Sequence, residues 1–413
     1  MGLYWTRTGQ MRTVHPPHVR VATRGTTREI NRRIALNLIR TNQPISRADL
    51  ARLMGTRRGA VSLLVNELIE EAAVFEGATG EAKRGRKPTF LYIDSRKRCV
   101  VAVDIRPTRT YMMVTDLVGQ QLVTVTSFPT ERDPKKFVVD LTRRIRALLS
   151  EHKDLGLCQG VGVVVPGMVE STTGRVLRAP NLGWKDVQLR DPIASALRVP
   201  VQIENSGKAC ALAQAWGNRD PKVKDFVYIT VSDGLGVGIV MNGELVRGQH
   251  NIAGELGHVP LNIDGPRCGC GATGCWEAYV SNLATLSRYF GRDLRERPVA
   301  ADVAALTVDD LIARARGGDG KALAALLSTG RYLGLGLGSV VNAIDPAHVY
   351  IGGEITAAWD LIEATVRSAL AERALTPPAG ATPITIVPPE QYPRLRGAAA
   401  LVAAPSFAER VVA

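Results

Sequence analysis

Four potential metal ligands lie within a short stretch of the chain. His258 ends the segment A-G-E-L-G-H, and the segment C-G-C-G-A-T-G-C supplies Cys268, Cys270 and Cys275. Three thiolates and one imidazole form a closed tetrahedral set, the usual composition of a structural zinc site. The glycines between the cysteines suit a loop that bends tightly round an ion. We therefore predict a structural Zn²⁺ at these four residues; the alternative is reduced cysteines without a metal.

Two carboxylates flank these ligands. Glu255 precedes His258 by three residues, and Glu277 follows Cys275 by two. A metal-bound loop would hold both carboxylates in place, and two fixed carboxylates beside an imidazole are good acceptors for sugar hydroxyls. The pattern therefore predicts a sugar site. On spacing alone, a pair of solvated loop acids remains the alternative.

The stretch G-E-L-G-H, followed by C-G-C-G-x-x-G-C-W-E, resembles the signature of the ROK family (repressors, open reading frames and sugar kinases). The resemblance extends over nearly the whole chain. It implies that the histidine and cysteines bind zinc and that Glu255, His258 and Glu277 contact a sugar. It also implies sugar contacts from Asn181 in A-P-N-L-G-W and from Asn205 in I-E-N-S-G-K.

Two departures from the family's pattern argue against catalysis. The resemblance places the family's catalytic aspartate at Ser206, and a serine hydroxyl is a poor substitute for a carboxylate as proton acceptor. Where the family's kinases read D-I-G-G-T, this chain reads D-I-R-P-T. Arg106 fills space that glycine leaves open, and Pro107 has no N–H to offer a phosphate. We predict no catalytic residues and no enzyme activity; an active ROK sugar kinase is the alternative.

The chain from Cys99 onward must position these residues. Three β-rich runs, beginning at Cys99, Tyr111 and Gln121, lead into strands that alternate with helices. The resemblance implies an α/β, two-lobed, actin-like (ribonuclease-H-like) sugar-kinase fold over residues 96–413. The glycine-rich segment 331–344 is expected to be a core helix rather than an interface.

The positive charge is concentrated near the N-terminus. The chain carries a net charge of +13, and residues 1–98 contribute 19 Lys+Arg against 8 Asp+Glu. A basic segment joined to a near-neutral body is typical of a nucleic-acid-binding protein; a basic segment that serves only solubility is the alternative. Residues 1–25, with the pair Pro16-Pro17 and no apolar periodicity, are predicted to form a disordered basic arm.

Residues 26–95 are predicted to form a winged helix-turn-helix domain, an α+β module. Helices are expected over 30–40, after an N-cap at Ser46, and over 56–70 with Thr56 as a candidate cap. Strands over 73–76 and 89–93 would flank the basic tip K-R-G-R-K-P. The third helix would enter the major groove, and the tip the minor groove or the phosphates alone. The predicted DNA contacts are Arg47, Thr56, Arg57, Arg58, Ser62, Asn66, Arg84 and Arg86. A three-helix module that does not bind DNA is the alternative.

The parts together predict a DNA-binding transcriptional regulator, a repressor of carbohydrate-metabolism genes whose degenerate kinase domain senses a sugar or sugar derivative. Its expected partners are a double-stranded DNA operator, the effector and, by resemblance, a second copy or three more copies of the chain. A ligand-independent DNA-binding regulator is the alternative. We find no apolar run of membrane-spanning length and no signal-peptide core, so we expect a cytoplasmic, nucleoid-associated protein.

Overall fold

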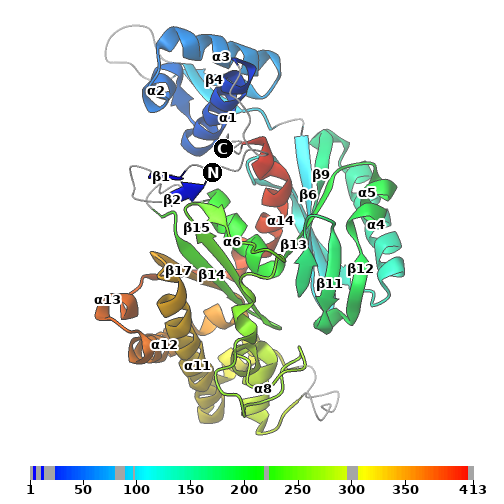
Figure 1. Ribbon diagram of the computed structural model, residues 1–413. Helices are drawn as coiled ribbons and strands as arrows, with labels where there is room; N and C mark the ends of the chain where they lie inside the picture. The colour runs from blue at the N-terminus through cyan, green and yellow to red at the C-terminus, as the bar shows by residue number, and fades with distance from the viewer. Residues whose placement is uncertain are drawn as a thin grey trace. The chain divides into compact units, whose positions relative to one another are not determined.

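The computed structural model describes residues 3–5, 11–13, 24–79, 89–95, 98–217, 223–294 and 306–407. The chain forms two compact units (Figure 1). The first unit contains residues up to Lys97 together with the chain end from Ala403, and the second runs from Arg98 to Val402. The sequence had assigned all of residues 96–413 to one domain. The chain end belongs to the first unit because the buried ring of Phe407 lies 5.8 Å from the Arg40 guanidinium, a long-range contact without a local sequence signal.

Helices and a small sheet make up the first unit. The helices are α1 (Arg24–Asn42), α2 (Arg47–Leu53) and α3 (Arg58–Glu70). The strands β3 (Ile45–Ser46), β4 (Val74–Thr79) and β5 (Thr89–Ile93) form an antiparallel sheet in the order β3-β5-β4. As predicted, α3 buries its apolar stripe of Val61, Leu64, Val65 and Leu68.

The ends of α2 and α3 differ in how they are capped. The Ser46 hydroxyl accepts a hydrogen bond from the Asp49 N–H at 3.1 Å, which confirms the predicted N-cap of α2. The suggested cap at Thr56 is wrong: α3 starts at Arg58, and its N-cap Arg57 makes no side-chain capping bond. Thr56 instead closes the turn after α2, because its N–H donates to the Ala51 carbonyl at 3.0 Å.

Part of the expected disordered arm has regular structure. Strands β1 (Leu3–Trp5) and β2 (Met11–Thr13) pair antiparallel, and α1 begins at Arg24 rather than at Ile30. The prediction of an arm without structure is therefore wrong at these positions, since pairing between two short segments leaves no local periodicity. The remaining residues of the arm lie outside the described residues, as does the tip that carries Arg84 and Arg86.

The second unit has two lobes, and the first lobe is built on a mixed five-stranded sheet of order β13-β9-β6-β7-β8. The strands β6, β7 and β8 form the predicted antiparallel meander, and β9 and β13 continue the sheet in parallel. Helices α4 and α5 and a small sheet of β10, β11 and β12 complete the lobe. The bounds are β6 (Arg98–Ile105), β7 (Arg109–Thr115), β8 (Gln121–Pro129), α4 (Pro134–Glu151), β9 (Leu157–Val165), β10 (Met168–Glu170), β11 (Arg175–Ala179), β12 (Trp184–Gln188), α5 (Arg190–Leu197) and β13 (Val201–Asn205).

The second lobe is built on a sheet of order β16-β15-β14-β17-β18. Several helices cover it (Figure 1), and the 25-residue α11 packs along α12. The bounds are β14 (Phe226–Val231), β15 (Leu235–Met241), β16 (Glu244–Leu245), α7 (Glu277–Val280), α8 (Asn282–Phe290), α10 (Val308–Arg316), α11 (Gly320–Ile344), β17 (His348–Gly352), α12 (Trp359–Arg373), α13 (Pro377–Gly380) and β18 (Ile384–Val387).

Two helices lie between the sheets of the two lobes: α6 (Ser206–Gly217) and α14 (Pro393–Ala403) (Figure 1). The backbone of α14 crosses β9 so closely that a Cβ at Gly162 would lie 1.8 Å from the Ala398 carbonyl oxygen. Helix α6 packs on β15 of the second lobe. Because glycines let these backbones approach closely, the lobes meet through one continuous packed layer. Among the described residues, no helix is long and apolar enough to cross a membrane.

Helix α11, which contains the glycine-rich segment, is largely buried and therefore part of the core. One of its glycines supports the loop with the predicted metal ligands. A Cβ at Gly336 would lie 1.9 Å from the Trp276 ring, and the Trp276 indole N–H donates to the Tyr332 carbonyl at 2.9 Å. Trp276 directly follows Cys275 and precedes Glu277, so α11 anchors both.

We expect Gly336→Ala to destabilise the protein by about 1–3 kcal/mol, because the added methyl group must displace the Trp276 ring. An alanine inside a helix normally stabilises it relative to glycine, so the sign is informative. Gly320→Ala, in the first turn of the same helix with open space around the site, is the matched control. Thermal unfolding of both variants tests this, and an unchanged melting temperature for Gly336→Ala would refute the anchoring role.

Candidate functional site

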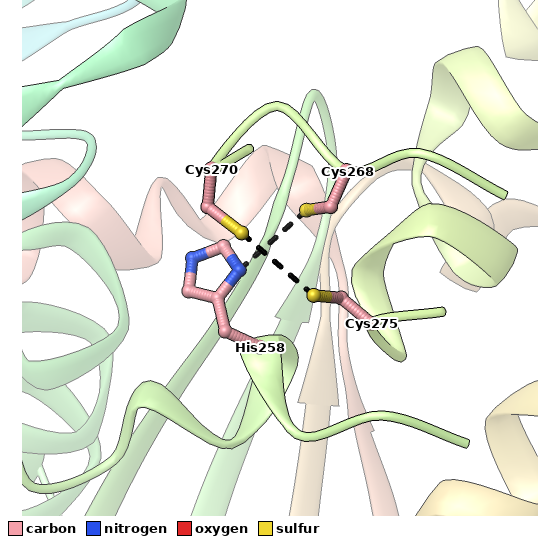
Figure 2. Close-up of side chains that lie close together, drawn as sticks. All are labelled: His258, Cys268, Cys270 and Cys275. Carbon is pink, nitrogen blue, oxygen red and sulfur yellow. Dashed lines mark hydrogen bonds between the residues drawn. The ribbon is translucent and has the colours of Figure 1, made fainter. Parts of the chain in front are cut away.

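The four predicted metal ligands come together in one cluster (Figure 2). Their ligand atoms all lie within 4.8 Å of one another. His258 Nδ1 lies 3.6 Å from Cys268 Sγ, and Cys270 Sγ lies 3.7 Å from Cys275 Sγ. Around a tetrahedral ion with metal–ligand bonds of about 2.1–2.3 Å, such edges are about 3.6–3.8 Å long. The cluster therefore fits a four-coordinate metal ion, and its sulfur separation is too long for a disulfide.

The loop between the ligands is a tight hairpin. The Cys268 N–H donates to the Ala272 carbonyl at 2.8 Å. Gly271 and Gly274 have φ angles of 100° and 71°, in the left-handed region that favours glycine. At Gly274 a Cβ would lie 1.5 Å from the Asn262 carbonyl oxygen, so no other residue fits there. These glycines let the short segment turn its three sulfurs toward one point.

The surroundings of the cysteines disfavour free thiolates. Burial raises the pKa of both the Cys268 and the Cys275 thiol. Without an ion these groups stay protonated at neutral pH, since burial disfavours the charged form. Metal binding would therefore release protons and stabilise the folded loop at the same time.

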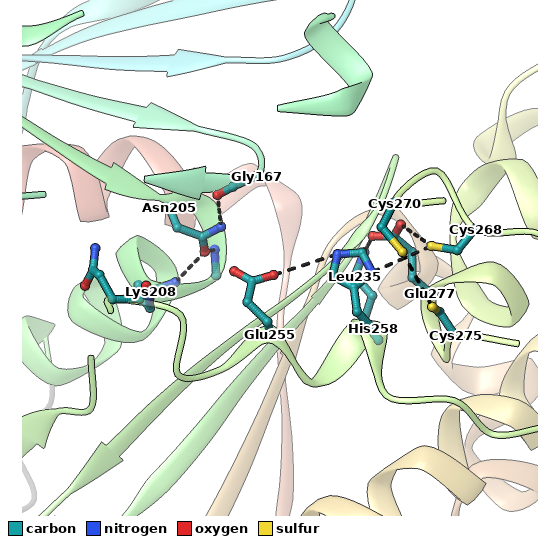
Figure 3. Close-up of polar contacts among 12 residues, drawn as sticks. Gly167, Asn205, Lys208, Leu235, Glu255, His258, Cys268, Cys270, Cys275 and Glu277 are labelled. Atoms are coloured by element: carbon teal, nitrogen blue, oxygen red, sulfur yellow. Dashed lines mark hydrogen bonds and ion pairs between the residues drawn. The ribbon is translucent and has the colours of Figure 1, made fainter. Parts of the chain in front are cut away.

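One cleft in the second unit is lined by all five residues predicted to contact a sugar. They are Asn181, Asn205, Glu255, His258 and Glu277. Asn181 lies in the 3₁₀ turn η3 (Pro180–Leu182), Asn205 ends β13, and Glu277 starts α7. Glu255 and His258 are the first and last residues of the turn η4 (Glu255–His258). The fold thus gathers side chains that are far apart in the sequence (Figure 3).

The carboxylates are coupled to the metal-ligand cluster. Glu277 Oε2 accepts a hydrogen bond from the Leu235 N–H at 2.9 Å, and its Oε1 lies 3.5 Å from Cys268 Sγ (Figure 3). Glu255 Oε2 lies 3.8 Å from His258 Nε2, so the imidazole faces the cysteines with one nitrogen and Glu255 with the other. Burial raises the pKa of Glu255, and the nearby His258 and Lys208 oppose that shift.

Asn205 is held by the backbone around it. Its side-chain amide donates to the Gly167 carbonyl at 2.7 Å, and its Oδ1 accepts the Gly207 N–H at 2.8 Å (Figure 3). Lys208 follows the cleft-lining Ser206 by two residues in the sequence. Its side chain is 1 % exposed and donates a hydrogen bond to the Asn251 carbonyl. Burial lowers the pKa of Lys208, whereas Glu204 and Glu255 act in the opposite direction. Sequence reasoning missed this lysine because a lysine in a helix is normally solvated.

The part of the cleft lined by Pro107, Ser206, Asp233 and Arg394, called its far end below, contains the two departures from the kinase pattern. Pro107 and Ser206 both line it. Beside them, Arg106 Nε lies 2.8 Å from Asp104 Oδ2, and its Nη1 lies 3.1 Å from Glu354 Oε1. Burial alone would lower the pKa of Arg106, but Asp104 and Glu354 outweigh it and the pKa is raised. A permanently charged side chain therefore bridges the first and second lobes where a kinase has glycines.

Sequence reasoning missed two further residues of this end, Asp233 and Arg394, which also line the cleft. Asp233 is exposed and lies two residues after Val231, the last residue of β14. Arg394 lies at the start of α14, and its Nη1 is 3.8 Å from Asp104 Oδ1. The carboxylate within S-D-G-L-G was the available signal for Asp233. No signal in the sequence marked Arg394, because only the packing of α14 brings this side chain to the cleft.

In the first unit, the structure connects three of the residues predicted to contact DNA. Arg47 Nη1 donates to Asn66 Oδ1 at 2.8 Å and to the Ser62 carbonyl at 3.2 Å. Arg47 also pairs with Glu76 at 3.0 Å. Thr56, Arg57 and Arg58 are exposed at the beginning of α3. These contacts do not test DNA binding.

Fold and site together define a two-lobed, sugar-kinase-like protein that carries an additional N-terminal helical unit. The chain belongs to the ROK family, whose pattern matches residues 100–404. It is 29% identical over 349 residues to a xylose repressor of Bacillus subtilis, covering 84% of this chain and 88% of that protein.

Two solved structures extend the comparison. A ROK family transcriptional regulator, a homologue of the E. coli MLC protein, superposes with a TM-score of 0.76 at 26% identity, covering 92% of this chain and 97% of that chain. A ROK family glucokinase from Streptomyces griseus, solved with glucose and AMPPNP, has a TM-score of 0.62 at 27% identity. It covers 73% of this chain and 98% of that chain, so the regulator matches more of this chain than the kinase does.

We expect Cys270→Ser to abolish binding of one metal ion per chain and to lower the melting temperature, because the tetrahedral set loses a ligand. Metal content after dialysis, measured by plasma mass spectrometry, tests this. Cys158→Ser, which changes a cysteine outside the cluster, is the control and should keep its metal. Full metal content in Cys270→Ser would contradict the ligand assignment.

Proposed function

We propose that this chain is a sugar-responsive transcriptional repressor. The observation that carries the proposal is a cleft that keeps the sugar-contacting residues of the family but is lined by Pro107 and Ser206, while the neighbouring Arg106 is paired with Asp104 and Glu354. The match to a xylose repressor over most of the chain supports the same function. The sugar enters between the two lobes, and the first unit binds an operator.

The metal is Zn²⁺ and its role is structural. Three sulfurs and one imidazole nitrogen at tetrahedral separations suit zinc, and such a closed set leaves no open coordination position. The bound ion holds the loop that places Glu277 against Leu235 and turns His258 toward Glu255. The sugar contacts proposed here are hydroxyl hydrogen bonds to Asn181, Asn205, Glu255, His258 and Glu277.

The first unit is a winged helix-turn-helix domain in this proposal. Arg57 and Arg58, exposed at the N-terminal end of α3, are positioned as in helices that read base edges or phosphates in the major groove. The Arg47 bridge to Asn66 holds α2 and α3 in register and leaves the amide nitrogen of Asn66 for the DNA. Arg84 and Arg86 remain proposed contacts of the wing tip.

Phosphoryl transfer is not part of the proposed function. Ser206 offers no general base, and Pro107 donates no N–H toward a phosphate. The Arg106 side chain is held in place by two carboxylates and stacks 4.7 Å from the Tyr111 ring. Binding a nucleotide would require those contacts to break.

Chain connectivity offers a path from the cleft to the first unit. Strand β6 begins at Arg98, directly after the first unit, and leads to Asp104, Arg106 and Pro107. Helix α14 starts beside the cleft at Arg394 and ends where the chain returns to the first unit. Since a ligand can shift only an equilibrium between states that it binds differently, the open and closed forms of the lobes must also differ in how well they bind DNA. The proposed repressor is a cytoplasmic homodimer or homotetramer that reads paired half-sites.

We expect Arg58→Ala to weaken binding to a duplex selected from a random pool by about 5-fold to 150-fold, with a smaller salt dependence if the contact is to phosphate. Arg367→Ala, which removes an exposed arginine of α12, is the control and should bind as the parent does. Fluorescence anisotropy at several salt concentrations measures both. Failure of the full chain to select any duplex would overturn the repressor proposal.

A sugar from a panel that includes D-xylose and D-glucose should release the selected duplex from the parent protein. Glu277→Gln should lose this response while still binding DNA, because it removes a charged acceptor from the cleft. If the duplex is bound but no sugar releases it, the chain is a ligand-independent regulator instead.

ADP release from Mg-ATP and each sugar should stay at background, even in Ser206→Asp, because Pro107 still offers no backbone N–H to a phosphate and Arg106 stays paired with Asp104 and Glu354. A coupled assay with pyruvate kinase and lactate dehydrogenase measures this. Turnover by the parent protein would restore the kinase alternative.

A further inference from the structure

Charge at the far end of the cleft distinguishes between two classes of sugar ligand. Four charged groups there form one network: Asp104 and Glu354 with Arg106 and Arg394. Two carboxylates and two guanidinium groups neutralise one another. Both arginines are largely enclosed, with side chains 29% and 11% exposed, so neither is a free surface cation.

Asp233 adds a fifth charge to this network. It lines the cleft together with Ser206 and Pro107 and is open to the water there. The charged neighbours that act on the Asp233 carboxylate are Arg394 and Arg106 of one sign and Glu354 and Asp104 of the other. Those four charges balance, so the Asp233 carboxylate is an excess negative charge on the cleft wall, and Glu390 in the adjoining hollow adds negative charge rather than offsetting it.

At two positions of the cleft lining, the backbone offers no N–H that could offset that charge. In phosphate loops, successive backbone N–H groups converge on the anion. Here Pro107 has no N–H, and the Leu235 N–H is already bound by the Glu277 carboxylate at 2.9 Å. The same cleft is also lined by Glu255 and Glu277, and Lys208 acts on the Glu255 carboxylate. A zinc ion bound by three thiolates and a neutral imidazole would leave that cluster with one net negative charge as well.

From this arrangement we propose that the effector is an unphosphorylated sugar and that Asp233 is the residue that discriminates against its phosphorylated form. The inference rests on the proposed sugar-sensing function and names the class of ligand. A free hydroxyl at this end donates a hydrogen bond to the Asp233 carboxylate. A phosphate monoester, with about −1.5 to −2 charges at neutral pH, meets like charge there instead.

Isothermal titration of the zinc-loaded full chain with matched pairs tests the inference: D-glucose, D-mannose and N-acetyl-D-glucosamine, each against its 6-phosphate. For the pair whose neutral member binds, the phosphate should bind at least about tenfold more weakly. The Kd of the sugar phosphate divided by the Kd of the free sugar should fall several-fold in Asp233→Asn, because the variant binds the sugar phosphate better. Asp360→Asn, which removes an exposed carboxylate of α12, is the charge-matched control and should leave the ratio unchanged.

The outcomes separate the inference from the function on which it rests. Equal or tighter binding of a sugar phosphate, through Arg394, would overturn the inference while leaving the sensor intact. If the sugar phosphate binds weakly but the ratio of its Kd to that of the free sugar is unchanged in Asp233→Asn, Asp233 is not the discriminating residue. If no sugar of any pair binds, the proposed sensing function fails and the inference fails with it. Unfolding curves of Asp233→Asn verify that the variant is folded.

Discussion

The position of Glu277 depends on the loop that carries the three cysteines, which is fixed by contacts to other parts of the chain. Three cysteines and His258 turn their ligand atoms toward one point, and Trp276 packs against Gly336 of α11 between Cys275 and Glu277. The four ligand atoms could hold a metal ion that would draw the thiolates together, and the helix supports the loop through Trp276. Because Glu277 also accepts the Leu235 N–H, one loop connects the metal-ligand cluster, the cleft and strand β15. Removing any of these contacts affects the others.

The opposite end of the cleft is held by side chains in place of a nucleotide. Arg106 reaches from the end of β6 to Glu354 of the second lobe, and Arg394 approaches Asp104 from α14. In a kinase, this region must open to a phosphate and close around it. Here a neutral ion network occupies the region permanently, so the lobes can respond to a sugar without a second substrate. Arg106, which stands where the family's kinases have glycine, therefore provides a contact between the lobes.

Much of this architecture was predictable, because its signals are local. The spacing of His258, Cys268, Cys270 and Cys275 is a dense signal, and the structure brings those four together as expected. The apolar stripe of α3 and the Ser46 cap were also read correctly, since periodicity and capping depend on residues within one or two turns. The start of α3 was misplaced by two residues because Thr56 is held by a backbone bond of the preceding turn.

What the sequence by itself determined was the chemistry of the residues: the ligand types, the lost carboxylate at Ser206, the proline at 107 and the basic N-terminal segment. Only the tertiary structure decided which of these meet. Arg394 and Asp233 gained their places at the cleft, and Lys208 its place near Glu255, because α14, α6 and the loop after β14 pack together from distant parts of the chain. Likewise, Phe407 joined the first unit through a contact made across nearly the whole sequence. Such contacts depend on side-chain packing between elements, and no local pattern encodes it.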